Sequence, residues 1–468
     1  MTTDLVQTTS VAESVAQWVV DLRWADIPEN VQRETVHSVL QSVAGGVAGL
    51  DMPEMQVALS MARAAGESGP ATILGDGMKV PLSTAVFANS VLWCALEQQE
   101  MHVPSRSHPH EVIVPVAMVL AEQLHPDGVT FLEAIVAGVE TTVALGKTAV
   151  DITSMMFTGR PGTSGIISAG AAATAAKLLG LDAPTTALAL CHAANFGSGL
   201  GEGLRQGTTE YHYTLGDASA NGLLAAQLAA AGAEATLNTF EGSAGIYARL
   251  TGLTEDELRA GDLHGRIMSL LGQVWGVSEH IYKRYPVHFP SLPFIDAAKT
   301  LRERHSIAAA DIQEIKLTIN NWLVYLKGGN LGPYTNREET RSAVALGVAC
   351  MLARGKFDLE DAKDPGAADI AELAAKTTVD INPDPSNDCW ELVRVEVVDK
   401  QGNSYVYDSD VEGIPDYRLG LPELRALAEA ALGAVIGRDN VTAVLDALES
   451  LETCPDVASL VPLLVRST

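Results

Sequence analysis

Hydrophobic side chains recur at helical spacing through residues 1–275. Val11, Val15, Trp18 and Val19 fall on one stripe, and apolar residues three and four apart mark one face of an amphipathic helix. The same pattern predicts helices over residues 29–50, 85–100 with Pro81 in the first turn, 111–124, 131–150, 165–181 and 221–232. The last two segments are apolar nearly all round, which is typical of helices buried on most faces.

The pattern changes near residue 276, where apolar and polar residues begin to alternate. Alternation with period two predicts strands over residues 315–319, 392–399 and 404–408. Gly402 and Asn403 supply turn geometry between the last two strands, so these two are expected to form a hairpin. A helix is predicted over residues 341–355, with Gly355 as its C-cap.

Helical periodicity returns after residue 415 and continues to the end of the chain. We therefore predict a mainly α fold, in which a large all-helical domain (residues 1–275 plus 415–468) carries an inserted, smaller α+β domain (residues 276–414). Alanine and glycine are abundant, whereas aromatic residues make up only 5% of the chain. Because small residues permit close contact between helices, this balance favours packed helices as well.

The chain is strongly acidic. It has 468 residues with 31 basic and 58 acidic side chains, which gives a formal net charge of −27. Binding to nucleic-acid phosphates or to an anionic membrane surface requires a basic face, so the charge argues against both partners. An anionic substrate would have to bind in a local basic pocket within this repulsive field.

Targeting and redox signals point to the cytoplasm. No run reaches the roughly 18 uninterrupted apolar residues typical of a membrane span. The first residues have neither the basic start nor the apolar core of a signal peptide. The five cysteines are widely separated and form no C-x-x-C pair, a pattern that suits a reducing compartment and argues against a disulfide framework or a zinc ribbon.

A polar segment between two predicted helices, residues 97–115, is the first candidate for chemistry. Its ionisable residues include Glu97, Glu100, His102, Arg106, His108 and His110. Histidine transfers protons near neutral pH, and a carboxylate can orient it or act as a base. The spacing matches no metal-ligand motif such as H-E-x-x-H, so no metal site is predicted. The alternative is an ordinary solvated loop between two helices.

Two further segments precede predicted apolar helices. Residues 155–166 combine three glycines with Arg160, and a helix start with an arginine can hold an anion. This segment contains no G-x-x-x-x-G-K-[ST] loop, so a nucleotide site is not expected. Tyr211, His212 and Tyr213 lie just before the helix at 221–232, where a tyrosine can act as an acid. The alternatives are a glycine-rich helix start without a ligand and ordinary ring packing at a helix entry.

A basic segment marks the start of the second predicted domain. Lys283, Arg284 and His288 lie at this domain junction, which is a favoured position for a ligand cleft. The neighbouring prolines fix the backbone there. The alternative is a rigid interdomain linker with solvent-facing basic residues.

The chain resembles the MmgE/PrpD family in four segments that occur in the same order: HPHEVIVPVAMVLAE, GTSG with AAATAAKLLGLD, LGDASANGLLAAQLAAAG with FEGSAGIY, and KRYPVH with IDAA. That family includes 2-methylcitrate dehydratase, cis-aconitate decarboxylase and iminodisuccinate epimerase. The resemblance implies a helical domain with an α+β lid domain, usually as a homodimer. It also implies an active site in the cleft between the domains, which handles small di- or tricarboxylates without a metal or an organic cofactor.

Three residues match functional positions of the family's motifs. His108 corresponds to the histidine of the H-P-S segment. Lys283 and His288 correspond to the lysine and the histidine of the K-x-[YF]-P-x-[HC] segment. The resemblance implies that these three side chains belong to the active site.

Other functional positions of the family are occupied by different residues here. The first aspartate of the D-x-D-D-T stretch falls on Gln98 and its threonine on His102. The G-[FW]-H-P-T histidine falls on Arg160, the lysine of K-x-L-H-x-G on Tyr211 and that segment's histidine on Thr214. These replacements are still polar, so we interpret the site as adapted to a different substrate or a different step rather than as abandoned.

The leading hypothesis is a cofactor-independent lyase or isomerase that moves a proton next to a carboxyl or carbonyl group of a small substrate. The predicted catalytic residues are His102, His108, Tyr211 and His288, and the predicted substrate-binding residues are Gln98, Arg160 and Lys283. Two alternatives stay open at this point. One is a specialised biosynthetic dehydratase or cyclase acting on a larger metabolite, and the other is a non-catalytic, ligand-binding member of the family.

Overall fold

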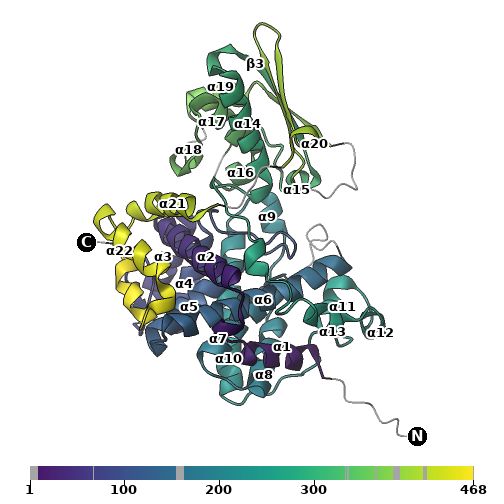
Figure 1. Ribbon diagram of the computed structural model, residues 1–468, viewed down its shortest axis with the longest axis vertical. Helices are drawn as coiled ribbons and strands as arrows, with labels where there is room; N and C mark the ends of the chain where they lie inside the picture. The colour runs from purple at the N-terminus through teal and green to yellow at the C-terminus, as the bar shows by residue number, and fades with distance from the viewer. Residues whose placement is uncertain are drawn as a thin grey trace. The chain divides into compact units, whose positions relative to one another are not determined.

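The computed structural model describes residues 9–66, 68–153, 163–332, 334, 337–363, 366–382, 390–414 and 419–466. The chain divides into two compact units (Figure 1). Unit 1 comprises Met1–Gly201, Tyr211–Ile281 and Gly420–Thr468, and unit 2 comprises Glu202–Glu210 and Tyr282–Leu419. The predicted mainly α fold is confirmed, because helices account for most elements and the larger of the two sheets lies in unit 2.

Unit 1 is a helical unit with one small hairpin. Its helices are α1 (Val11–Asp21), α2 (Glu29–Val47), α3 (Pro53–Ala65), α4 (Leu82–Cys94), α5 (His110–Leu124), α6 (Gly128–Ile152), α7 (Thr163–Leu178), α8 (Ala183–Asn195), α10 (Glu210–Ala230), α11 (Ile246–Thr251), α12 (Glu255–Ala260), α13 (Leu263–Met268), α21 (Leu421–Gly433) and α22 (Arg438–Glu449). The strands β1 (Ala71–Thr72) and β2 (Lys79–Val80) pair antiparallel.

The core of unit 1 depends on close approach between α6 and α7, which pack against each other. A Cβ added at Gly138 would lie only 2.0 Å from the Thr174 hydroxyl, and one at Gly170 only 1.9 Å from that of Thr142. Both separations are far below van der Waals contact, so only glycine fits at these two positions. This explains the abundance of small residues in the sequence.

Helix α6 is long and apolar enough to cross a membrane by length and composition. In its most apolar window, however, 83% of the residues are buried within the protein. Such burial is typical of a core helix in a soluble protein, since a lipid-facing helix exposes its apolar side chains.

The predicted boundaries are wrong at both ends of α4 and at the start of α10. The helix predicted to run to Glu100 ends at Cys94, and Pro81 is its N-cap rather than a residue of its first turn. The chain leaves the helix because Glu97 adopts a positive φ of 57°, which an α-helix excludes. Helix α10 starts at Glu210 rather than at the predicted Asn221, so Tyr211 and His212 lie inside its first turn instead of before the helix.

Unit 2 is built around a four-stranded sheet in the order β4-β3-β5-β6. The strands are β3 (Ile312–Ile319), β4 (Thr377–Ile381), β5 (Arg394–Asp399) and β6 (Ser404–Asp408). Strand β3 pairs parallel with β4 and antiparallel with β5, and β5 pairs antiparallel with β6. The predicted hairpin is thus confirmed, with Gly402 at a φ of 86° in its turn. Strand β4 was not predicted, because most of its side chains are exposed and it carries no clear apolar alternation.

Helices make up much of the rest of unit 2. They are α9 (Glu202–Gln206), α14 (Leu292–His305), α15 (Asn321–Tyr325), α16 (Arg337–Ser342), α17 (Val344–Arg354), α18 (Leu359–Lys363), α19 (Ala368–Ala374) and α20 (Ser409–Glu412). Helix α14 packs on β5, β6 and α17. The helix predicted over 341–355 is broken between α16 and α17, and its predicted C-cap Gly355 is confirmed by a left-handed φ of 72°.

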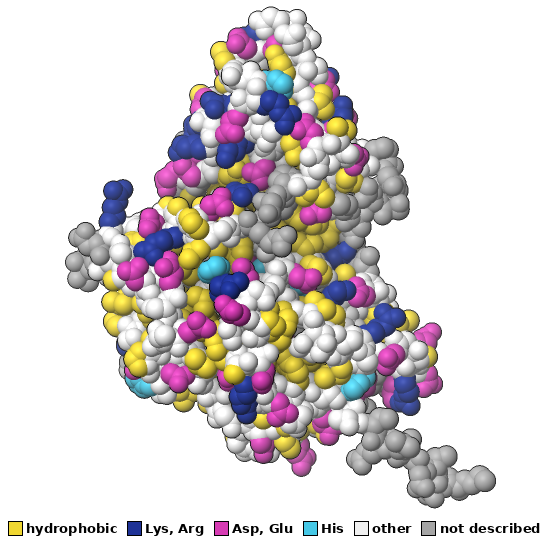
Figure 2. All heavy atoms as spheres, in the orientation of Figure 1, with side chains coloured by type: hydrophobic (Ala, Val, Ile, Leu, Met, Phe, Trp, Pro, Cys, Tyr) yellow, Lys and Arg dark blue, Asp and Glu magenta, His cyan; other side chains and the backbone are white. Residues whose placement is uncertain are grey.

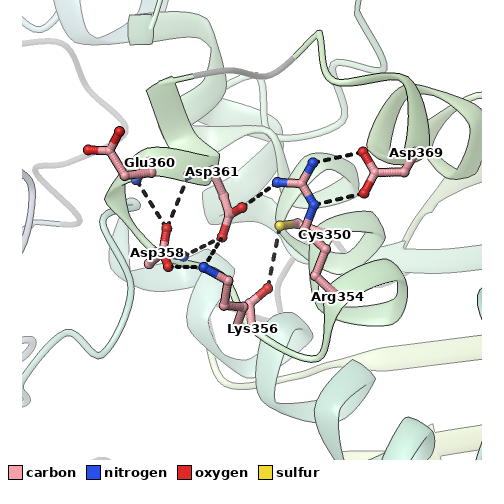
Figure 3. Close-up of polar contacts among 7 residues, drawn as sticks. All are labelled: Cys350, Arg354, Lys356, Asp358, Glu360, Asp361 and Asp369. Carbon is pink, nitrogen blue, oxygen red and sulfur yellow. Dashed lines mark hydrogen bonds and ion pairs between the residues drawn. The ribbon is translucent and has the colours of Figure 1, made fainter.

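An ion-pair network joins α17, α18 and α19 (Figure 3). Arg354 donates to both oxygens of Asp369 at 2.7 Å and also to Asp361. The Lys356 ammonium lies 2.5 Å from Asp358, which in turn accepts the backbone N–H of Asp361. Each of these charged groups therefore has an opposite charge or a backbone donor beside it. We refer to these residues as the Arg354 network.

Charges of both signs are mixed on the face drawn in Figure 2, where Lys and Arg side chains are interspersed with Asp and Glu side chains. The net charge of −27 is therefore distributed rather than gathered into one acidic patch on that face.

Candidate active site

The polar segment between α4 and α5 folds into a loop that is largely buried. We call residues 100–110 the histidine loop. Met101 exchanges both backbone hydrogen bonds with Ile281, at 3.0 and 2.9 Å, and His102 does the same with Ser107. These two short bridges hold the loop and place residue 280 beside it. The alternative of a solvated helix–helix loop is therefore wrong, since His102, His110 and Glu100 are all fully buried.

His102 is held by partners at both ring nitrogens. The backbone N–H of Ser105 donates to Nδ1 at 3.1 Å, and a backbone N–H can only donate. Nδ1 is therefore an acceptor, and the neutral ring carries its proton on Nε2, which lies 3.0 Å from the Glu279 carboxylate. This contact lowers the pKa of Glu279. Such a ring is well suited to orienting the loop and less suited to exchanging a proton with a substrate.

His108 is oriented differently. Its Nδ1 donates to the backbone carbonyl of Glu100 at 2.6 Å, because a carbonyl oxygen can only accept. In the neutral ring this leaves Nε2 as the basic nitrogen, and the side chain is only half-buried. A histidine whose tautomer is fixed by a backbone carbonyl has the arrangement expected of a general base.

Tyr211 lies in the first turn of α10, near the acidic groups of the histidine loop. Burial, with further contributions from Glu111, Cys94 and Glu100, raises the pKa of Tyr211 well above its usual value. The phenol consequently keeps its proton at neutral pH and can donate it. The Glu111 carboxylate in turn accepts a hydrogen bond from the side-chain amide of Gln99.

A buried group of three ligand-type side chains lies behind His108. The backbone N–H of His110 donates to Glu100 at 2.8 Å, and the His110 ring packs edge-on against His280 with 5.1 Å between centroids. Burial raises the pKa of Glu100, but the neighbouring His110 outweighs it, so the pKa of Glu100 lies below its usual value. Burial and the adjacent histidines lower the pKa of His280 well below its usual value, so this ring is neutral.

A second buried chain of polar contacts adjoins Tyr211. His212 Nδ1 lies 3.3 Å from the Cys94 sulfur, and Nε2 lies 3.7 Å from the Glu54 carboxylate. All three side chains are buried, and Cys94 also contacts the backbone carbonyl of Ser90. A thiol enclosed in this way has no route to a substrate, so the chain of contacts supports the packing of α3, α4 and α10.

The predicted residues Lys283 and His288 belong to unit 2. Lys283 is buried, and the backbone N–H of His288 donates to the carbonyl of Arg341 at 2.8 Å. The His288 ring lies 2.5 Å from the Ser342 hydroxyl through Nδ1. The structure thus gives His288 a defined orientation within its own unit.

Two predicted substrate-binding residues have different outcomes. Gln98 is half-buried, and its backbone carbonyl accepts a hydrogen bond from the Gln41 side chain. Arg160 lies outside the described residues. In unit 1, then, the described residues bring His102, His108 and Tyr211 into one neighbourhood with Glu100 and Glu111.

Two cavities among the described residues lie away from the predicted site residues. One of about 580 Å³ in unit 1 is lined by residues between Cys191 and Arg249, and one of about 120 Å³ in unit 2 includes Lys327 and Ser342. Neither is lined by a residue of the predicted site. Polar side chains line both cavities, but none of them belongs to the histidine loop. We place the chemistry at the oriented histidines, because the partner of His108 Nδ1 fixes which ring nitrogen is basic.

Sequence reasoning missed His280 and undervalued Glu100 and His110. No motif marks His280, and it reaches the histidine loop only because Met101 pairs with Ile281. Glu140 was also missed. Burial raises the pKa of Glu140 to about 7, although the N–H groups of Gly276 and Val277 donate to it. The signal for Glu140 was available, since it is a carboxylate in the mostly apolar middle of α6.

Comparisons with known proteins cover nearly the whole chain. The MmgE/PrpD N-terminal domain matches residues 13–259, and the MmgE/PrpD C-terminal domain matches residues 285–452. The chain is similar to the cis-aconitate decarboxylase-like protein oryM of Aspergillus oryzae, with 24% identity over 99% of this chain and 98% of the relative. It is also similar to cis-aconitate decarboxylase of Aspergillus terreus, with 25% identity over 97% of this chain and 96% of the relative.

Proposed function

The chain belongs to the MmgE/PrpD family, and we propose that it is a lyase that moves a proton at a carbon next to a carboxyl group of a small carboxylate substrate. The family includes dehydratases and decarboxylases, and the relatives are described as cis-aconitate decarboxylase or decarboxylase-like. Decarboxylation, dehydration and epimerisation all pass through enolate-like charge, so one proton-transfer site serves each of them.

The orientation of His108 is the observation that carries the proposal. Because Nδ1–H is bonded to the Glu100 carbonyl, proton transfer is assigned to Nε2. His102 is assigned a positioning role instead, since Ser105 and Glu279 engage both of its ring nitrogens. Tyr211, which stays protonated at neutral pH, is the complementary acid.

We propose that side chains implied by the family resemblance bind the negative charge of the substrate. Lys283, His288 and Arg160 are proposed to hold carboxylate groups, and Gln98 is proposed to bind a polar group without charge. Gln98 stands where the family has an aspartate, so we expect a substrate or step that differs from that of the decarboxylase relatives. We further propose a homodimer in the cytoplasm that needs no organic cofactor.

Solvent exchange tests the proposal whichever product the reaction forms. The protein is incubated in deuterated buffer with a panel of di- and tricarboxylates, and NMR spectra are recorded over time. We expect deuterium at the α-carbon of at least one substrate, or its conversion to a decarboxylated, dehydrated or epimerised product. Binding of a carboxylate with neither exchange nor conversion would contradict the proposal and favour a non-catalytic binding protein.

A further inference from the structure

The buried group behind His108 contains polar atoms that the protein leaves unsatisfied. Among the described residues, hydrogen-bond partners are lacking for Glu100 Oε2, for His110 Nδ1 and for both ring nitrogens of His280. Glu100 and His110 are 0% exposed and His280 is 2% exposed, so bulk water does not compensate. Because a buried unsatisfied polar group costs free energy, a group of them in one place requires an explanation.

The tautomer of His110 follows from its other nitrogen. The Ser38 hydroxyl donates its single proton to the backbone carbonyl of Thr35 at 2.9 Å, so towards His110 it can only accept. His110 Nε2, 3.2 Å away, is therefore the protonated nitrogen. In the neutral ring this turns the Nδ1 lone pair towards the Glu100 carboxylate, whose Oε1 lies 2.9 Å away.

The His110 Nδ1 lone pair and the Glu100 carboxylate repel each other at this distance unless a positive charge lies between or beside them. A second proton on His110 provides one such charge, but it leaves Glu100 Oε2 and both nitrogens of His280 without a partner. A metal cation provides the other, and it satisfies an atom of all three side chains at once. The ligand atoms of Glu100, His110 and His280 lie within 4.8 Å of one another.

We propose that Glu100, His110 and His280 bind a divalent transition-metal ion, with Zn²⁺ as the first choice. Two imidazoles and one carboxylate form a ligand set that suits Zn²⁺ and also Fe²⁺. Zinc bonds of about 2.0–2.2 Å place ligand atoms roughly 3–3.5 Å apart, so a small inward movement of the side chains completes the site. Ser38 acts as the outer partner that fixes the His110 ring, as such partners do in metal sites.

The ion would hold the histidine loop rather than react. Its ligand Glu100 also supplies the carbonyl that orients His108, so metal binding and the orientation of His108 are mechanically linked. The three ligands come from the loop, from the first residue of α5 and from the segment after Glu279. One ion therefore joins segments that are far apart in the sequence.

Metal binding is tested independently of any activity. The protein is purified without a polyhistidine tag, and its zinc, iron, manganese and cobalt contents are measured by elemental analysis. The metal-free protein is then titrated with Co²⁺, whose visible absorption reports its ligands, and Zn²⁺ is added in competition. We expect about one ion per chain, a Co²⁺ spectrum with nitrogen ligands, and displacement of Co²⁺ by Zn²⁺.

Matched variants separate this site from adventitious binding. His280→Ala and Glu100→Gln should each weaken Co²⁺ binding by more than about tenfold. His125→Ala, at an exposed histidine paired with Asp456, should bind as the wild type does. His280→Ala removes an unsatisfied group, so its metal-free form is expected to fold at least as well as the wild type. Stoichiometric binding that survives His280→Ala, or no Co²⁺ binding by folded wild-type protein, would overturn the proposal.

Discussion

The Arg354 network and the group around the histidine loop both bring ionisable side chains together, but they differ in burial and in how completely their polar atoms are paired. In the Arg354 network the arginine is 28% exposed and Asp369 is 50% exposed, and the guanidinium is bonded to both carboxylates beside it. In the group around the histidine loop, Glu100 and His110 are fully buried, and several polar atoms have no hydrogen-bond partner among the described residues.

The difference indicates two kinds of role. In the Arg354 network Asp361 is buried, but it is paired, and the other charges are at least partly exposed. Charges of this kind cost little to keep and contribute little, which suits a surface that joins three helices. Buried, incompletely paired groups lower stability, and such groups are typical of functional sites. We therefore assign a functional role to the histidine loop and a structural role to the Arg354 network.

The largest effect is expected from His108→Ala. Removing a general base lowers kcat/KM by about 10²- to 10⁴-fold. The control variant is His125→Ala, which should retain wild-type activity because His125 lies on the surface. Both are assayed with the substrate that the exchange experiment identifies. Equal activity of the two variants would remove His108 from the proposed mechanism.

The next largest effect is expected from Glu100→Gln on the stability of metal-free protein. The fully buried Glu100 carboxylate accepts the backbone N–H of His110, and a hydrogen bond to a charged group is stronger than one to a neutral amide, so we expect a loss of about 2–3 kcal/mol. Urea denaturation measures this loss. Asp369→Asn in the Arg354 network should cost less than about 1 kcal/mol, because that carboxylate is half exposed. If Asp369→Asn lost more stability than Glu100→Gln, the proposed difference between the buried group and the Arg354 network would be contradicted.

The pH dependence of stability should have opposite signs in the two units. Glu140 has a folded-state pKa of about 7, above its usual 4.5, so between these values the folded state binds more protons than the unfolded state. The free energy of unfolding should fall as pH rises through this range, on the order of 2 kcal/mol, and Glu140→Gln should remove this decline. Thermal unfolding between about pH 2 and pH 8 provides the measurement for both carboxyl groups, those of Glu140 and Asp369.

Asp369 behaves in the opposite way. Its hydrogen bonds to Arg354 hold the pKa of Asp369 below the usual 3.8, so the stability that it contributes is present above pH 3.8 and is lost as pH falls through the lower folded-state pKa. An unchanged pH profile in Glu140→Gln would show that the Glu140 carboxyl is not perturbed as described.

The smallest effect is expected from Arg354→Met. It removes a partner of the exposed Asp369 and of the buried Asp361, but Asp361 keeps Lys356 at 4.0 Å, so the free energy of unfolding should fall by about 1 kcal/mol. The loss should shrink at high salt, because exposed ion pairs are screened. Urea denaturation at low and high ionic strength checks both points, and a loss independent of salt would argue for packing rather than charge.

Local patterns predicted most of the fold and only part of the candidate site. The amphipathic stripe of α1, the apolar helices α6 and α7, and the β5–β6 hairpin all follow from periods of 3.6 or 2 in the sequence. The failures involve contacts between distant residues. Helix α4 stops at Cys94 and the loop turns to pair with Ile281, a partner that no local pattern reveals.

The same limit applies to the site. The histidines of the loop were visible as a cluster in the sequence, but their individual roles depend on partners such as Ser105, Ser38 and the Glu100 carbonyl. His280 had no signal at all, since it lies more than 160 residues along the chain from its neighbours in the loop. Sequence spacing therefore identified the region and the tertiary contacts assigned the chemistry.

Deuterium exchange compared across three proteins tests the central claim most directly. Wild type, His108→Ala and Arg354→Met are incubated with the same carboxylate in deuterated buffer, and α-carbon deuteration is followed by NMR. The account predicts exchange at similar rates in wild type and Arg354→Met, and at least about a hundredfold slower exchange in His108→Ala. Exchange in His108→Ala at the wild-type rate would contradict it.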